Sequence, residues 1–457
     1  MIKQYKFFKH RCFIEALACV VVLFFYSCSN SEFANNIELN KDSAMACNGG
    51  NFDEENTYVE EISSGLSDSC SAIENSQISD RQEYIPLNDS DYPYVGLPRI
   101  VIETEHFQKI DDCETEVLAK LQIWGDSTPY SEILDITIKG RGNSTWGYPK
   151  KPYTIKLAQS KAILGMPKAK KWILLANYRD RTLMRNAVAF ELARKTSLIW
   201  TPSGRFVEVF LNGKFLGNYF ICEKIEANKN RLNLGKNAYL LEFDTYYDGK
   251  LKFRTTYNNL PVNIKYPSKY DWASFDFIRN YIDSLEIILS QKDDSLDYLK
   301  FIDENSFADY LIVYAMANNG EPSAPKSVFM HKDENGKLTA GPVWDFDYST
   351  FNIHNNGFSN WDSAIFGSLT KKHTFRKVLR DRWRVDKVGF SQIYGFIDSL
   401  ENYIAESGAR NAKLWPIKLN VHAVGDENKS FDEAIKMLKN DIQKRIKELN
   451  VLIEKVD

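Results

Sequence analysis

The sequence predicts an α+β fold of two lobes with a cleft between them, strand-rich in its N-terminal half and helix-rich in its C-terminal half. Between residues 97 and 265, several runs alternate apolar and polar residues, as half-buried strands do. From residue 271 onward, apolar residues recur at spacings of three and four, the pattern of amphipathic helices. Strands and helices that are segregated along the chain are typical of α+β proteins. With 457 residues, 44% of them hydrophobic, the chain can bury a large core.

The strands are predicted in order along the first half. The first ones share the alternating pattern: residues 97–103, 119–124 and 134–139. A glycine-bearing loop and a further alternating strand follow at 140–157. In 205–226, two aromatic and β-branched arms flank Asn212-Gly213, the pair that a type I′ hairpin turn favours. A last strand region is predicted at 238–265, with a turn at 248–249.

The helices are predicted mainly after these strands, at 180–195, 271–290, 306–317 and from 430 to the C-terminus. Asp180 is a plausible N-cap for the first of them. A second hairpin, 327–347, turns at Asn335-Gly336. Ser430 and Glu433 have the spacing of a capping box at the start of the last helix. An apolar stripe follows it: Ile435, Leu438, Ile442, Ile446 and Leu449.

Residues 1–28 have the layout of an export signal peptide. Basic residues precede an apolar stretch that ends at Cys28, and this stretch is too short to predict a membrane-spanning helix. The small residue before Cys28 resembles a bacterial lipoprotein lipobox, which would make Cys28 the lipidated first residue of the mature chain. An ordinary secreted protein and a short membrane anchor are the alternatives. We therefore expect a location at the bacterial cell surface or in the periplasm.

Residues 29–92 are predicted to be an acidic, disordered tether. They contain fourteen acidic residues against Lys41 and Arg81, with scattered Ser and Asn. The remaining body, residues 93–457, has a net charge of about +6. A mildly basic body suits an anionic ligand such as a nucleotide, although ordinary charge scatter gives the same value.

Metal sites built on cysteine or histidine are disfavoured by the sequence. It has seven cysteines and six histidines, but no CxxC pair and no Cys/His cluster at metal-binding spacing.

The carboxylates Asp345 and Asp347 in GPVWDFDYST are a different case. Two residues apart on a predicted strand, they would share one face, and two like charges so close need a cation, a proton or a basic side chain. Either a cation binds there, or the acids lie in solvent or pair with lysines.

Five blocks of the sequence together resemble the spore-coat protein H (CotH) kinase family. They are Arg141-Gly142-Asn143-Ser144, residues 150–156, residues 174–186, residues 213–225 and Gly341-Pro342-Val343-Trp344-Asp345-Phe346-Asp347. The resemblance implies an atypical protein-kinase-like fold that binds ATP with Mg²⁺ or Mn²⁺ and phosphorylates Ser/Thr of a protein acceptor. It implies no nucleic-acid partner, and the membrane would be contacted only through the N-terminal lipid anchor.

The resemblance also implies roles for individual residues. Asp345 and Asp347 would bind the metal ion, and Asp345 resembles the metal-binding aspartate of kinases. The remaining candidates would bind the nucleotide: Arg141, Asn143, Ser144, Lys151, Lys156 and Glu223. Each has a structural alternative: a loop stabilised by its own hydrogen bonds, surface lysines, and an ion pair for Glu223. Asn177, Arg185 and Asn186 are expected in a buried polar network that holds a helix against the sheet.

The sequence departs from the family pattern upstream of the aspartates. Asn319 fits the catalytic loop, but Glu321 stands where an aspartate is expected, and Lys326 or Ser327 stands where a metal-binding asparagine would be. Glu321 could still accept a hydroxyl proton, with altered reach, whereas Lys326 would repel a second Mg²⁺. A kinase-fold surface protein that binds protein or glycan with little or no catalysis is therefore an alternative. A two-metal hydrolase using Asp345, Asp347 and Glu321 is a third.

Overall fold

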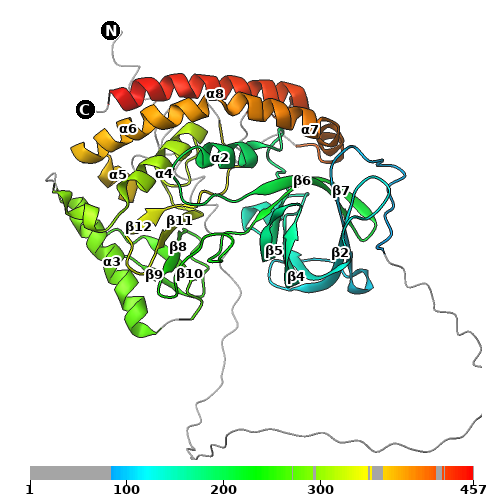
Figure 1. The fold of residues 1–457 in the computed structure, drawn as a ribbon, viewed down its shortest axis with the longest axis horizontal. Helices are drawn as coiled ribbons and strands as arrows, with labels where there is room; N and C mark the ends of the chain where they lie inside the picture. Colours follow the sequence, from blue (N-terminus) through cyan, green and yellow to red (C-terminus); the bar gives the residue numbers. More distant parts are fainter. Residues whose placement is uncertain are drawn as a thin grey trace, which may run out of the picture. The chain divides into compact units, whose positions relative to one another are not determined.

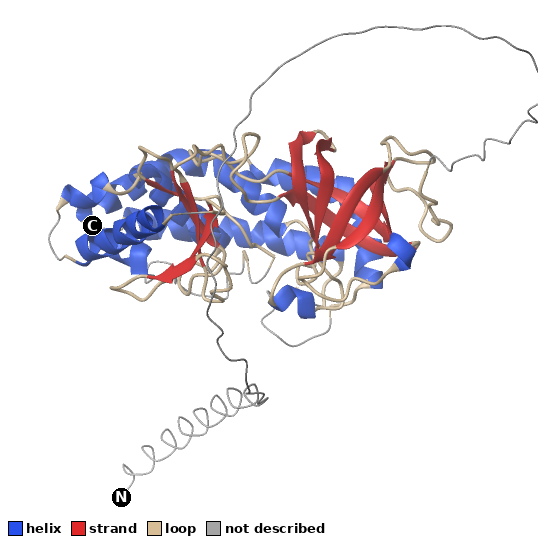
Figure 2. Cartoon of the chain, turned by 90° about the horizontal axis from the view of Figure 1, so that it is seen from below, coloured by secondary structure: helices blue, strands red, loops and turns tan. Residues whose placement is uncertain are grey.

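The strands of the chain form two separate sheets. The structure is a computed structural model, and it describes residues 84–269, 271–291, 295–347, 350–351, 364–417, 425–426 and 428–455. One sheet is a closed barrel, and the other is an open sheet of five strands. Figure 2 shows them as two distinct groups of strands. The predicted strand-rich N-terminal half and helical C-terminal half are both confirmed.

The barrel contains the first seven strands, in the order β1-β2-β3-β4-β5-β7-β6. It closes because β1 pairs with β6. This pair is parallel, whereas all other pairs of neighbouring strands in the barrel are antiparallel. The bounds are β1 (Arg99–Thr104), β2 (Val117–Trp124), β3 (Leu134–Gly140), β4 (Tyr153–Ile163), β5 (Met166–Leu175), β6 (Gly204–Leu211) and β7 (Lys214–Glu223). Asn212 and Gly213 both have positive φ, 52° and 73°, as the type I′ turn between β6 and β7 requires.

The second sheet has the order β12-β11-β8-β10-β9. Its strands are β8 (Tyr239–Phe243), β9 (Lys252–Arg254), β10 (Pro261–Tyr266), β11 (Val328–Lys332) and β12 (Leu338–Ala340). Every residue of β8 and β11 is buried. In the barrel, β3 instead buries every second residue, and these side chains contribute to the barrel's own core.

Most helices stack against one another, α3 extends away from them beside the second sheet, and α7 contacts the barrel strand β7 (Figure 1). The helices are α2 (Arg185–Arg194), α3 (Trp272–Ser290), α4 (Glu304–Ala317), α5 (Ala364–Leu369), α6 (His373–Phe390), α7 (Ile393–Leu414) and α8 (Phe431–Glu454). The predicted capping box of Ser430 and Glu433 starts α8. Asp180 is not the N-cap of α2, which is Met184. Among the described residues, no helix is long and apolar enough to cross a membrane.

The segment that carries the two aspartates is not a strand. β12 ends at Ala340, and residues 341–346 have no regular structure. Pro342 has no N–H to continue a ladder, and Asp345 has a left-handed φ of 70°. The prediction that Asp345 and Asp347 share a strand face is therefore wrong, and other contacts must determine their positions.

The folded body begins earlier than residue 93. The backbone N–H of Ile85, a buried residue, donates to the Gln122 side chain at 2.8 Å. Tyr92 stacks on Phe215 with ring centres 4.0 Å apart. Residues 84–92 thus pack on the barrel rather than belonging to a solvated tether. The predicted signal peptide, Cys28 and the rest of the tether lie outside the described residues.

Candidate functional site

A cavity of about 600 Å³ opens between the loops of the barrel and the second sheet. The barrel contributes the loop after β3, the start of β4, the end of β5 with the residues after it, and the residues after β7. The second sheet contributes residues of β8, β10 and β11. The turn after α4 and the segment after β12 complete the lining. Side chains that lie far apart in sequence therefore meet around one space.

Three half-buried carboxyl groups face this cavity: Asp345, Asp347 and Glu321. Burial raises the pKa of Glu321 to about 8, and the nearby Asp345 charge adds to that shift. Burial and the Asp345 charge likewise raise the pKa of Asp347 to about 8. The pKa of Asp345 is raised by burial too, although Arg141 opposes the shift. The three groups thus favour a bound proton or a nearby positive charge.

The chemistry of these donors fits one hard divalent cation. Glu321 has a buried Oε2 with no hydrogen-bond partner among the described residues. Within the same residues, no group of three or more His, Cys, Asp or Glu side chains is arranged to hold a metal ion. A structural zinc site would need four such ligands, whereas Mg²⁺ commonly takes one or two carboxylates and completes its shell with water and phosphate. Asp345 and Asp347 match the second pattern.

Two half-buried cations face the same space without a direct ion pair, although Arg141 acts through its charge on Asp345 and Asp347. Arg141 lies over the ring of Trp344, 5.6 Å from the ring centre. Burial lowers the pKa of Lys224 to about 8, and Lys171 and Lys265 reinforce that shift. No described carboxylate forms an ion pair with either Arg141 or Lys224. Because unpaired buried cations are costly, the pair is suited to an anionic ligand.

Acidic and basic side chains of the second sheet complete the cavity. Lys265 on β10 forms a 2.9 Å ion pair with Glu242 on β8. Asp244 follows β8, and burial raises its pKa to about 6. Tyr246 lies beside Asp244 in the lining. Polar groups thus reach the ligand space from both sheets.

The structure brings six of the predicted site residues to the cavity. They are Arg141, Asn143, Ser144, Glu321, Asp345 and Asp347. The loop that carries the first three depends on Gly142, whose φ is 84° and whose Cβ position would fall 1.9 Å from Thr145 Oγ1. A side chain at residue 142 would therefore displace this part of the lining.

Three predicted nucleotide-binding residues do not line the cavity. Lys151 Nζ donates to the Trp146 carbonyl at 2.5 Å. Lys156 forms an exposed ion pair with Glu116 at 3.1 Å. Glu223 accepts a hydrogen bond from the Ser203 N–H and lies 3.7 Å from Arg231. Lys156 is thus a surface lysine, and Glu223 lies in an ion pair with Arg231. Both are the structural alternatives that the sequence left open.

Asn319 lies behind the cavity and joins two of its acids. Its Nδ2 donates to the Asp345 carbonyl at 2.8 Å, and its Oδ1 accepts from the Glu321 N–H at 2.9 Å. The side chain is buried. Asn319 is therefore placed to position Glu321 and Asp345 rather than to touch a ligand.

A family model described as CotH kinase protein matches residues 138–449. The chain belongs to the CotH kinase family. No curated protein matches the sequence. The matched range includes every cavity residue from Lys139 onward, whereas the N-terminal 137 residues lie outside it.

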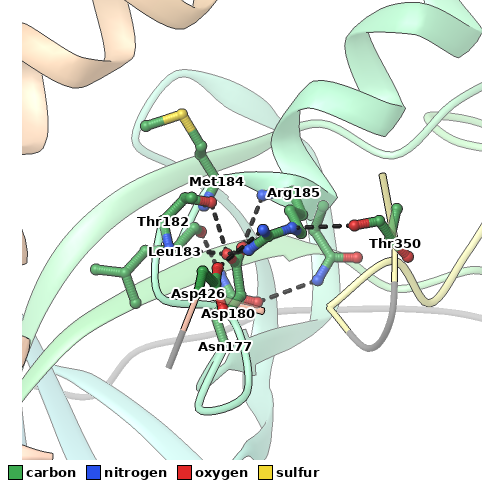
Figure 3. Close-up of polar contacts among 9 residues, drawn as sticks. Asn177, Asp180, Thr182, Leu183, Met184, Arg185, Thr350 and Asp426 are labelled. Carbon is green, nitrogen blue, oxygen red and sulfur yellow. Dashed lines mark hydrogen bonds and ion pairs between the residues drawn. The ribbon is translucent and has the colours of Figure 1, made fainter. Parts of the chain in front are cut away.

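In this CotH-family chain, a buried polar network holds the segment after β12 (Figure 3). Arg185, at the start of α2, forms ion pairs with Asp180 and with Asp426, the latter at 2.9 Å. Its Nε donates to the Thr350 carbonyl at 3.1 Å. Asp180 also accepts the Arg185 backbone N–H at 2.8 Å, so it satisfies a helix N–H although it is not the N-cap.

The network continues to the aspartate segment through two asparagines. Asn186 Oδ1 accepts the Phe346 N–H at 2.9 Å. Asn186 Nδ2 donates to Asn177, whose own amide donates to the Leu183 carbonyl at 2.7 Å. The expected buried network of Asn177, Arg185 and Asn186 is thus present, and it also fixes the residue between the two aspartates.

Sequence reasoning assigned nucleotide binding to Glu223 and missed the neighbouring Lys224. Glu223 and Lys224 belong to the same sequence block, and successive residues at the end of a strand point to opposite sides. Glu223 is buried toward Arg231, so Lys224 faces the cavity. Lys265, Glu242 and Asp244 come from the second sheet, whose position against the barrel has no local signal.

We expect Arg185→Met to lower the free energy of unfolding by about 3–5 kcal/mol, because it leaves two buried carboxylates without their cation. Urea denaturation at pH 7 measures the change. Arg384→Met is the matched control, because its ion pair with Glu454 is exposed and contributes little to stability. Equal losses in the two variants would contradict the structural role of Arg185.

We expect the ligand-free protein to lose stability as pH rises from about 5 to 8. The raised pKa values of Asp347 and Glu321, both about 8, mean that the folded state holds protons that the unfolded state has released. Each such proton contributes at most about 1.4 kcal/mol per pH unit. Asp347→Asn should flatten this dependence and be more stable than the parent protein at pH 8. Asp135→Asn, at an exposed position, is the control; an Asp347→Asn profile parallel to the parent's would refute the prediction.

Proposed function

We propose that this chain is an atypical ATP-dependent protein kinase that transfers a phosphoryl group to Ser or Thr of a protein acceptor. Membership of the CotH kinase family supports a kinase-like activity. The observation that carries the proposal is that one cavity holds unpaired cations, Arg141 and Lys224, together with the acids Asp345 and Asp347. Phosphoryl transfer needs this combination, since catalysis depends mainly on positioning phosphates and stabilising their charge.

The two aspartates would hold one divalent metal ion, Mg²⁺ or Mn²⁺. When bound, the ion would neutralise phosphate oxygens of ATP and withdraw charge from the transferring group. Arg141 and Lys224 would bind other phosphate oxygens, and Arg141 offers a planar fork of donors for this purpose. The turn at Gly142 lets the backbone of the loop approach the phosphates closely.

Glu321 would act as the general base. It would accept the proton of the acceptor hydroxyl as that oxygen attacks the phosphorus. Its pKa of about 8 without ligand lies near the working pH, where a base is most effective. A cation bound beside Asp345 would lower that pKa and keep Glu321 ionised at neutral pH. Asn319 would hold the Glu321 backbone in place.

The cellular setting belongs to the same proposal. We place the enzyme outside the cytoplasm, anchored through a lipid on Cys28 and separated from the membrane by the acidic segment that begins at residue 29. The barrel and the second sheet would form two lobes around the nucleotide. The lipobox-like sequence supports the lipid anchor on Cys28. The lining of the cavity by residues of both sheets supports the two lobes.

The test uses the full chain with labelled ATP, Mg²⁺ or Mn²⁺ and a Ser-rich acceptor protein. Glu321→Gln should lower kcat by about 10²–10⁴-fold, the usual contribution of a general base, and change nucleotide affinity little. Asp345→Asn should abolish metal-dependent nucleotide binding in calorimetry. Asp135→Asn, exposed on β3, is the control for both measurements.

Two outcomes would contradict the proposal in different ways. Unchanged Mg·ATP affinity of Asp345→Asn would remove the metal site from this cavity. Binding of Mg·ATP without transfer to any acceptor would favour the alternative, a kinase-fold surface protein that has lost catalysis. The Glu321 and Lys326 departures from the family pattern are the observations that favour this alternative.

A further inference from the structure

Lys326 lines the cavity, and it is one of two residues, with Ser327, that stand where the kinase pattern would have a metal-binding asparagine. It ends a turn that begins at Glu321, and its backbone N–H donates to the Glu321 carbonyl at 3.3 Å. Its ammonium group lies 5.6 Å from the ring centre of Tyr246, which also lines the cavity. A positive side chain therefore occupies the rim beside the acids.

The charge of Lys326 acts on the same acids that would surround the metal ion. Burial raises the pKa of Glu321 and of Asp345, and Lys326 partly offsets both shifts. A fixed positive charge that reaches both acids repels a second divalent cation between them.

The donors around Lys326 are also too few for two metal ions. Asp345 and Asp347 supply the protein share that one Mg²⁺ commonly takes. No larger group of metal-binding side chains exists within the part of the chain that the structure describes. Protein kinases hold their two Mg²⁺ ions with an aspartate and an asparagine, and here Lys326 or Ser327 stands where that asparagine would be.

We propose that the Lys326 ammonium group takes the place of a second divalent cation, so that this protein binds its nucleotide with one metal ion only. The inference rests on the proposed function, because it concerns the nucleotide phosphates of that site. A lysine can fill this role since its ammonium is a compact charge with three donors on a flexible stem. Its contact with the Tyr246 ring restricts that stem at the rim.

The experiment counts metal ions directly. The full chain is saturated with a non-hydrolysable ATP analogue, and Mn²⁺ is titrated while free Mn²⁺ is followed by electron paramagnetic resonance. We expect one Mn²⁺ per protein for the parent chain and two for Lys326→Asn, with spin coupling between the two ions. Lys326→Arg keeps the charge and should bind one. Lys120→Asn, at an exposed lysine outside the cavity, should also bind one.

A second measurement tests the role of the charge. With one Mn²⁺ per protein, Lys326→Asn should bind the analogue roughly tenfold more weakly, the usual effect of losing one charge-assisted bond. Excess Mn²⁺ should restore its affinity. Lys326 is exposed, and thermal melting should show a folded variant.

The outcomes separate the inference from the function on which it rests. Two Mn²⁺ ions in the parent chain, or one in Lys326→Asn with the analogue bound, would overturn the inference and leave the proposed function intact. A parent chain that binds no Mn²⁺ with the analogue would overturn both.

Discussion

The ion pairs of Arg185 with Asp180 and Asp426 are the constraint on which the site depends. A buried guanidinium between two buried carboxylates stabilises only if every donor and acceptor is satisfied. The Nε–H of Arg185 donates to the Thr350 carbonyl, and the Asn186 side chain accepts the Phe346 N–H. One helix start thereby determines the course of the segment after β12.

That segment is unfavourable in isolation. Asp345 has a left-handed φ of 70°, and burial, with the Asp345 charge second, raises the pKa values of Glu321 and Asp347. Strain and repulsion of this kind persist only where the surroundings fix the chain. Asn319 holds the Asp345 carbonyl, and the Tyr314 hydroxyl bonds both the N–H and the carbonyl of Trp344. Hydrogen bonds from these uncharged groups therefore hold Asp345 close to the other acids despite their like charges.

The sequence predicted what depends on local physics. The turn at Asn212-Gly213, the capping box at Ser430 and the alternation of β3 all follow from neighbouring residues, and all are present. Prediction from the sequence failed where contacts with elements distant along the chain determine the structure. The strand expected through Asp345 ends at β12 because Pro342 cannot continue the ladder. Lys156 looked like a phosphate ligand by spacing, but closure of the barrel places it on the exposed face beside Glu116. Five of the six predicted residues that meet in the cavity come from loops within the family motifs, and Glu321 comes from the turn after α4, where the sequence departs from the pattern.

The two departures from the kinase pattern together add one positive charge to the site. Glu321 keeps the negative charge of the expected aspartate, and Lys326 adds a positive charge that an asparagine would not supply. The Lys326 backbone bonds the Glu321 carbonyl, so one short turn carries both residues. Loss of function alone gives no reason for Glu321 to remain a half-buried acid with an unpaired Oε2, because such a group is costly to keep without a ligand. A site that uses one metal ion and one ammonium group gives that acid a cation and gives the phosphates a second positive charge.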